Sequence, residues 1–291
     1  MSKLLNNRYQ MTAPLGKGGF GITFIAEDTF LPSRRPCVIK QLRPGTQNPE
    51  VYEEIKRRFE REAAILEDLS NGTNSIPKLY AYFTEENKFY LVQELIEGIN
   101  LEQKVQRDGV LSSSEVIRIL IDVLSILQYI HKKGIIHRDI KPANIMLRKS
   151  DNKPVLIDFG AVKEVLGHGT GAASMVIGSL GYMPMEQGMG RPIFSSDLYS
   201  LAMTALYLLS GKEPQDFHSD PQSGKIIWRN QLPALPASLA DTLEQALEPY
   251  PRERFPSAEA MLRSLGDLQL DMLTDQMKQF RRRGTSRTTD T

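Results

Sequence analysis

The stretch His137-Arg138-Asp139-Ile140-Lys141-Pro142-Ala143-Asn144 is the strongest signal in the sequence, and Asp158-Phe159-Gly160 follows it after a short β-type segment. Two charged residues, Lys40 and Glu62, precede them in the chain. Each residue alone has an ordinary structural explanation, such as a surface lysine whose stem packs along a strand. Their order and spacing together would hardly arise by chance, so the combination decides how the rest of the chain is interpreted.

A glycine-rich run, Gly16-Lys17-Gly18-Gly19-Phe20-Gly21, lies between two predicted strands. Glycines at such positions let the backbone approach phosphates that a side chain would push away. A dinucleotide-binding loop would need a helix directly afterwards, but the β-type run Ile22-Thr23-Phe24-Ile25-Ala26 follows. We therefore predict a strand-loop-strand flap over a nucleotide, with a simple tight turn as the alternative.

A lysine stands on the next predicted strand, in Val38-Ile39-Lys40, where it alternates with apolar neighbours. Its ammonium could hold the α- and β-phosphates of the nucleotide. Glu62, on a predicted amphipathic helix, can pair with Lys40 and fix its position. Glu60 is the competing partner, but Glu62 is the one followed by apolar residues at helical spacing, so we expect the pair to be Lys40 and Glu62.

The first part of the chain is mostly β-type with one helix. Five runs of strand length, separated mostly by turn residues, predict an antiparallel sheet from residues 9–15, 22–28, 37–42, 79–83 and 89–94. Between the third and fourth runs, residues 51–69 carry apolar side chains at helical spacing among charges. This pattern predicts an amphipathic helix packed on the sheet.

The second part is mostly helical. Ser112 and Glu115 form a capping box that starts a long helix, which Gly134 stops. Another helix is predicted from about residue 196 to 210, with apolar residues almost all round it, as in a helix buried on every side. Shorter helices are predicted at residues 239–247 and 257–268.

Composition narrows the class of protein. Apolar residues make up 41% and charged residues 24% of 291 residues, as in ordinary globular proteins. Lys plus Arg (36) nearly balance Asp plus Glu (35), so no basic field favours nucleic acid. The single cysteine, Cys37, excludes an intrachain disulfide and favours the cytoplasm. No run is both long and apolar enough to predict a membrane span.

These motifs resemble those of the protein kinase superfamily, and of its bacterial serine/threonine members in particular, over residues 9–268. The resemblance implies an α+β, two-lobed kinase fold. The N-lobe (9–93) would be a five-stranded antiparallel sheet with one helix, joined by a hinge (94–97) to a mainly helical C-lobe (98–268). Residues 275–291, which include Arg281, Arg282 and Arg283, are predicted to be a disordered basic or polar tail or linker.

The resemblance also implies a role for each motif. Asp139 would accept the proton of the substrate hydroxyl, and Lys141 would steady the γ-phosphate. Asn144, the third catalytic residue, would bind Mg²⁺ together with Asp158, with Mn²⁺ as a possible substitute. The expected ATP-binding residues are Leu15, Gly16, Lys17, Gly18, Gly19, Phe20, Gly21, Ile22, Thr23, Val38, Lys40, Glu62, Glu94 and Ile96.

The hinge and the hydroxyl class follow from the same resemblance. Gln93 would be a polar gatekeeper behind adenine, and the backbone of Glu94 and Ile96 would face the adenine edge. Lys141 resembles the serine/threonine branch, because tyrosine-specific kinases usually have a different catalytic-loop sequence there.

The activation segment runs from Asp158 to Glu186. Ser179, where family members commonly have Thr, keeps the hydroxyl that would bridge Asp139 and Lys141. Structural roles are implied for three residues: Glu186 would pair with Arg254, and Asp197 would anchor the backbone of the catalytic loop.

Arg138, directly before the catalytic aspartate, suggests control by phosphorylation of the activation segment. Thr170 and Ser174 are the candidate acceptors, and the alternative is that both are simply solvated hydroxyls.

We therefore expect a serine/threonine protein kinase that uses ATP and Mg²⁺ on protein substrates with Ser or Thr acceptors. One alternative is a pseudokinase that binds nucleotide as a scaffold or regulator. A small-molecule phosphotransferase on the same fold ranks lower, because such families generally lack the combined glycine flap and Glu186–Arg254 pair. The sequence does not indicate an oligomeric state.

Overall fold

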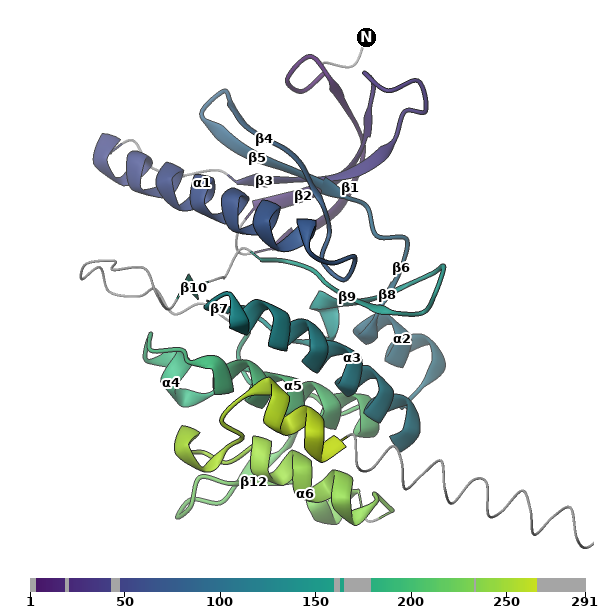
Figure 1. Ribbon diagram of the computed structural model, residues 1–291, viewed down its shortest axis with the longest axis vertical. Helices are drawn as coiled ribbons and strands as arrows, with labels where there is room; N and C mark the ends of the chain where they lie inside the picture. The colour runs from purple at the N-terminus through teal and green to yellow at the C-terminus, as the bar shows by residue number, and fades with distance from the viewer. Residues whose placement is uncertain are drawn as a thin grey trace, which may run out of the picture. The chain divides into compact units, whose positions relative to one another are not determined.

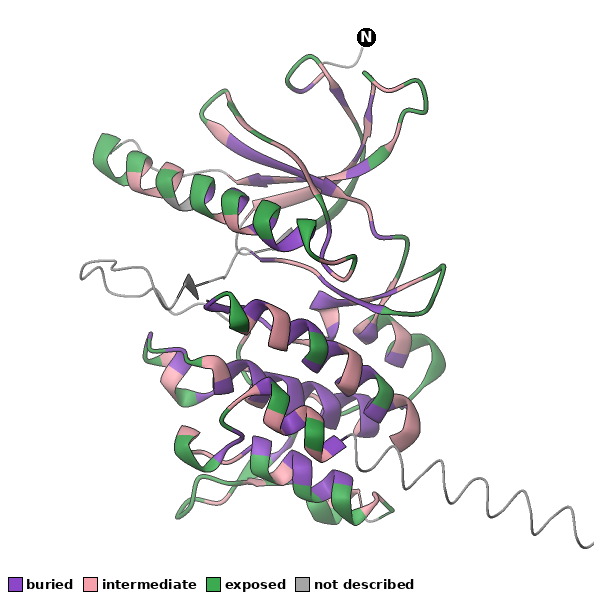
Figure 2. Cartoon of the chain, viewed as in Figure 1, coloured by how far each residue is buried: buried purple, intermediate pink, exposed green. Residues whose placement is uncertain are grey.

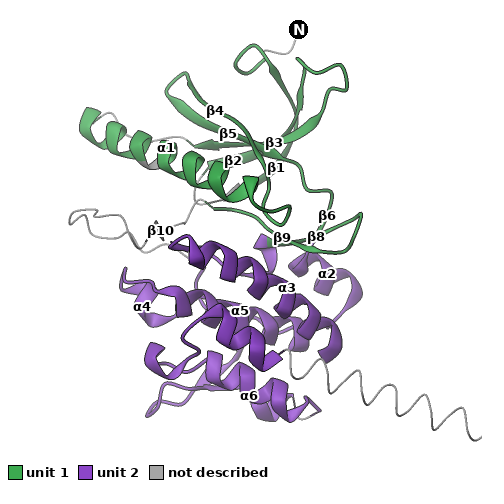
Figure 3. Cartoon of the chain, in the orientation of Figure 1, with its two compact units in different colours: residues 1–99, 145–162 green, residues 100–144, 163–291 purple. Residues whose placement is uncertain are grey.

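The computed structural model describes residues 4–18, 21–42, 48–159, 163–164, 179–232 and 234–265. The chain divides into two compact units, residues 1–99 with 145–162 and residues 100–144 with 163–291 (Figure 3). Residues 145–162 thus group with the first unit, whereas the sequence placed them in the C-lobe. Two backbone hydrogen bonds explain the grouping: Leu156 N–H donates to Ser75 O and Lys149 N–H donates to Glu97 O.

The first unit contains the predicted five-stranded antiparallel sheet, with strand order β1-β2-β3-β5-β4 (Figure 1). Its strands are β1 (Tyr9–Gly18), β2 (Gly21–Asp28), β3 (Pro36–Leu42), β4 (Leu79–Glu85) and β5 (Lys88–Glu94). A smaller sheet has the order β6-β8-β9 and comprises β6 (Gly98–Asn100), β8 (Ile145–Arg148) and β9 (Pro154–Leu156).

The two faces of the large sheet bury different apolar clusters because side chains alternate along each strand. One cluster joins Tyr9, Ala26, Cys37, Ile39, Tyr90 and Val92. The other face packs against α1 (Pro49–Asn71), where Phe59 stacks on Phe89 with ring centroids 5.0 Å apart. Lys40 is paired in register with Leu91, a member of this second cluster, and so lies on the α1 side of the sheet.

The second unit is mainly helical. Its elements are α2 (Leu101–Asp108), α3 (Ser113–Lys132), α4 (Met185–Gly188), α5 (Phe194–Ser210), α6 (Ala237–Ala246), a helical stretch at 258–265, the strand pairs β7 (Ile135–Ile136) with β10 (Lys163–Glu164) and β11 (His218–Ser219) with β12 (Ile226–Ile227), and the 3₁₀ turns η1 (Pro142–Asn144), η2 (Pro214–Asp216), η3 (Arg229–Gln231) and η4 (Pro251–Glu253).

The predicted helices are present, with small shifts at their ends. The Ser112–Glu115 capping box starts α3, and Gly134 follows the helix with a φ of 75°. Helix α5 is buried along almost its whole length, as its apolar pattern predicted (Figure 2). Helix α2 was not predicted, although Asn100 and Gln103 form a capping box at its start.

Nothing in the described ranges offers a helix with both the length and the apolar character needed to cross a membrane.

Gly16 and Gly21, the two ends of the glycine run, differ in how well the fold would tolerate a side chain at each position. A Cβ on Gly21, whose φ is +140°, would lie 1.9 Å from the Gln41 carbonyl oxygen on β3, whereas a Cβ on Gly16 would meet nothing within 4 Å. Gly21→Ala should therefore lower the free energy of unfolding by about 2 kcal/mol or more, because the backbone must shift. Gly16→Ala should change it by less than about 1 kcal/mol. Chemical denaturation of both variants checks this, and equal stabilities would contradict it.

Candidate active site

The carboxylate of Asp139 lies in the loop between β7 and η1 of the second unit, and the residue is 8% exposed. Its Oδ1 accepts a hydrogen bond from Ser179 Oγ at 2.9 Å. Lys141 Nζ lies 3.0 Å from Oδ2 and also donates to Ser179 Oγ at 2.6 Å. The predicted bridge by Ser179 between Asp139 and Lys141 is therefore present.

Asn144 holds the same carboxylate from η1. Its Nδ2 donates to Asp139 Oδ2 and to the Asp139 backbone oxygen, each at 2.8 Å. Because the amide nitrogen is used twice in this way, Oδ1 is the atom that remains for a metal ion. A hard oxygen ligand of this kind suits Mg²⁺.

Asp197, in the first turn of α5, anchors the backbone that leads to Asp139. This fully buried carboxylate accepts hydrogen bonds from His137 N at 2.9 Å and from Arg138 N at 2.9 Å. Burial opposes its ionisation, but the interactions with His131, His137 and the Arg138 backbone N–H together outweigh this effect, so the pKa of Asp197 lies below its usual range. The predicted anchoring role is present in the geometry.

His131 contacts Asp197, an interaction that the sequence did not reveal. Its Nε2 lies 2.8 Å from Asp197 Oδ2, and its ring packs on Phe194 with centroids 4.8 Å apart. The sequence offered no metal-like spacing for this histidine, and its position six residues before His137, where the catalytic-loop motif begins, was the one available signal.

The predicted pair of Glu186 and Arg254 is also present. Arg254 Nη1 donates to Glu186 Oε1 at 2.7 Å and Nη2 donates to Oε2 at 3.2 Å. The Arg254 side chain is fully buried and donates further to the carbonyl oxygens of Glu248 and Pro249. This pair of hydrogen bonds fixes α4, which begins at the end of the activation segment.

In the first unit, Lys40 pairs with Asp158 and not with Glu62. Lys40 Nζ lies 2.8 Å from Asp158 Oδ1, and no ion pair shorter than 4.0 Å joins Lys40 to Glu62 among the residues that the structure describes. Burial raises the pKa of Glu62 to about 7, against the lowering effect of the Lys40 charge, and Asp158 raises it further. The expected direct pair of Lys40 and Glu62 was therefore wrong: the ammonium lies beside Asp158, and burial disfavours the charged form of Glu62.

Two residues at these sites have left-handed backbone conformations that L-amino acids seldom adopt. Arg138 has a φ of 70° and Asp158 a φ of 65°. Such conformations in residues other than glycine persist only where the surroundings hold them, and they are frequent at functional sites. Both lie in the motifs that the sequence singled out.

The glycine run joins two strands, as predicted. Gly18 faces Gly21 and Gly16 faces Thr23 across β1 and β2, so no helix follows the run. Leu15 is exposed, whereas Ile22, Thr23 and Val38 are half-buried. Several predicted positions lie outside the described residues: Gly19, Phe20, Gly160, Thr170, Ser174 and 275–291.

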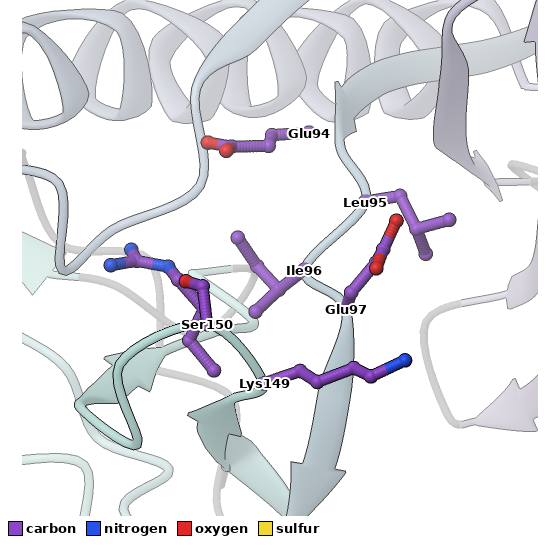
Figure 4. Close-up of a pocket in the computed structure, with 7 residues that line it drawn as sticks. Glu94, Leu95, Ile96, Glu97, Lys149 and Ser150 are labelled. Carbon is purple, nitrogen blue, oxygen red and sulfur yellow. The ribbon is translucent and has the colours of Figure 1, made fainter.

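The predicted hinge borders a cavity of about 530 Å³ in the first unit. In Figure 4, Glu94 and Ile96 point to one side of the hinge backbone, and Leu95 and Glu97 point to the other. The opposite wall is the turn between β8 and β9, with Arg148, Lys149 and Ser150. Gln93, the predicted gatekeeper, is buried beside this segment, and the adenine contacts of Glu94 and Ile96 stay predictions.

Comparison with known proteins agrees with this geometry. A family model described as "Protein kinase domain" matches residues 9–279. The chain is 53% identical over 270 residues to "Serine/threonine-protein kinase PknA" of Nostoc sp., covering 91% of this chain and 48% of that protein. It is 52% identical over 268 residues to "Serine/threonine-protein kinase C" of Synechocystis sp., covering 90% and 50%. The chain thus spans about half the length of the curated relatives it matches.

The pKa of Glu62 predicts a specific pH dependence of stability. A carboxyl whose pKa rises from 4.5 to about 7 on folding makes the folded state less stable as the pH increases between these values. Glu62→Gln should therefore be more stable than the wild type at pH 8, by up to about 3 kcal/mol, with a difference that shrinks toward pH 5. Denaturation across this range measures it. Glu60→Gln, at an exposed position of α1, is the control, and identical pH profiles for the two variants would contradict the prediction.

Proposed function

The chain belongs to the protein kinase family, and from this premise we propose that it transfers the γ-phosphate of ATP to serine or threonine hydroxyls of proteins. The observation that carries the proposal is the Asp139 carboxylate, which Ser179, Asn144 and Lys141 hold in one orientation. The names of the curated relatives, which are serine/threonine-protein kinases, support the class of acceptor.

Asp139 would act on the acceptor hydroxyl. Its carboxylate is nearly buried but charged groups and donors surround it, so it can orient the hydroxyl and accept the proton as the new bond forms. Lys141, whose ammonium lies beside both Asp139 and Ser179, would offset negative charge on the γ-phosphate. Positioning and charge neutralisation are what this reaction chiefly requires from a protein.

Roles in binding ATP and Mg²⁺ are proposed for Lys40, Asp158 and Asn144, as the resemblance to protein kinases implies. Lys40 would bind the α- and β-phosphates, while Asn144 Oδ1 and the Asp158 carboxylate, which is 35% exposed, would supply oxygen ligands for the metal ion. When bound, Mg²⁺ neutralises charge on the phosphate oxygens, and Mn²⁺ would serve as a substitute. The other predicted nucleotide contacts, from Leu15 to Thr23 and at Val38, Glu94 and Ile96, belong to the same proposal.

Phosphorylation of the activation segment would regulate the enzyme. Arg138 is 5% exposed, and desolvation lowers its pKa. A phosphate group interacts more strongly with a desolvated guanidinium than with a hydrated cation, because the local dielectric constant is low. Thr170 and Ser174 are the proposed acceptors.

The remaining parts of the proposal concern setting and alternatives. A cytoplasmic location is supported by Cys37, a free and buried thiol. Protein substrates are proposed, with no nucleic-acid partner. The pseudokinase alternative is less well supported, because Lys40, Asp139 and Asp158 each retain the side chain that the reaction needs.

The activity test compares wild type with Asp139→Asn in labelled ATP, Mg²⁺ and casein. The amide cannot accept the hydroxyl proton, so turnover should fall on the order of 10²- to 10⁴-fold. Asp241→Asn is the matched control, since that exposed aspartate of α6 pairs with Arg229 at the surface and should leave turnover unchanged. Nucleotide binding without transfer by the wild type would instead indicate a pseudokinase.

The Ser179 hydroxyl gives a second test. Ser179→Ala removes two hydrogen bonds, to Asp139 and from Lys141, and should lower kcat about 10- to 100-fold, as expected for bonds to charged groups. Ser179→Thr keeps the hydroxyl and should recover most of the turnover. Steady-state kinetics measures both, and an alanine variant as active as the threonine variant would show that the bridge is unimportant.

A further inference from the structure

Gln187 is a fully buried side chain of α4 that the sequence did not single out. Its Nε2 donates a hydrogen bond of 2.6 Å to the backbone oxygen of Arg138. The backbone of Gln187 is itself fixed, because the preceding residue, Glu186, is held by Arg254 and by the Ser196 hydroxyl at 2.7 Å. Gln187 therefore reaches the catalytic loop from a rigid support.

The hydrogen bond from Gln187 is made to the peptide group that links Arg138 to Asp139. The oxygen of this group, from Arg138, is bound by Gln187, and its N–H, from Asp139, donates to His137 Nδ1 at 3.3 Å. The preceding N–H, of Arg138, is bound by Asp197. The two peptide groups that flank Arg138 are thus held on both sides of a residue with a left-handed φ of 70°.

This arrangement matters because the backbone at Arg138 sets the direction in which the next side chain points. A left-handed conformation is unfavourable for arginine, so the backbone at Arg138 would change to a more favourable conformation if one of these hydrogen bonds were lost. A small rotation there would move the Asp139 carboxylate away from Ser179 and Asn144. Loss of correct geometry at a reacting group is expensive in rate even when binding is unaffected.

We propose that Gln187 is a positioning residue for phosphoryl transfer, which orients the Asp139 carboxylate through the Arg138 carbonyl. This inference rests on the proposed kinase function. Two residues at or just after the end of the activation segment would then orient Asp139: Ser179 binds the carboxylate directly, and Gln187 binds the peptide group before it. The placement of residues 179–188 therefore sets the orientation of the catalytic group.

The alternative is that Gln187 only fills space in the core. The Gln187→Met variant distinguishes this packing role from the proposed positioning role. Methionine has a similar size and no donor, so kcat should fall about 10- to 100-fold while KM for ATP changes less than about twofold. Thr204→Val is the control, because Thr204 is buried in α5 and donates to Ser200 O, away from the loop. A fall in kcat matched by the control, in proportion to a fall in Tm, would show a structural role and overturn the proposal.

Gln187→Glu supplies a readout that packing alone would not change. A protonated glutamate can donate to the Arg138 oxygen, whereas an ionised one repels it, so the kcat of this variant relative to wild type should rise as the pH falls from 8 to 6. A flat ratio across this range, or wild-type kcat for Gln187→Met, would overturn the proposal. Casein phosphorylation by the wild type, lost in Asp139→Asn, is measured in parallel. If the wild type itself transfers no phosphate, the proposed function fails rather than the role of Gln187.

Discussion

The buried carboxylate of Asp197 is the charge on which the geometry around the catalytic loop depends. A carboxylate without contact with water is costly unless donors surround it, and here His131 and the two backbone N–H groups of His137 and Arg138 do so. Satisfying this charge forces the loop to lie against α5 in one register. Since α5 is buried on nearly all sides, the reference point for the loop cannot move independently of the core.

Other hydrogen bonds and an ion pair in the second unit also position the residues around Asp139. Arg254 is buried and satisfies the charge of Glu186, which in turn fixes the helical turn that carries Gln187. These links join residues that are far apart in the sequence, for example positions 68 apart in the Glu186–Arg254 pair. Within the second unit, Asp139 is therefore positioned by interactions that begin in the buried core.

Much of the fold followed from local patterns in the sequence. Strand alternation placed Lys40 on a defined face of β3, and a capping box located the start of α3 correctly. The partner of Lys40 could not be found in this way, because it depends on the left-handed backbone at Asp158 and on desolvation of Glu62. Both effects arise only when distant segments pack together.

The contacts of His131 and Gln187 were out of reach for the same reason. Each is a single polar residue with no motif of its own, and its partner lies far away in the sequence. The Ser179 bridge, by contrast, was expected, since resemblance to a known family carried that information.

The environment of Lys40 has a consequence for the proton balance of the protein. The Lys40 ammonium pairs with Asp158 and also acts electrostatically on Glu62, whose pKa burial raises to about 7, close to neutral pH. Any ligand that adds charge beside Lys40 or draws Asp158 away changes how many protons Glu62 holds. Ligand binding in this unit is thereby linked to proton uptake or release. The heat of binding measured by calorimetry then includes the heat of ionisation of the buffer.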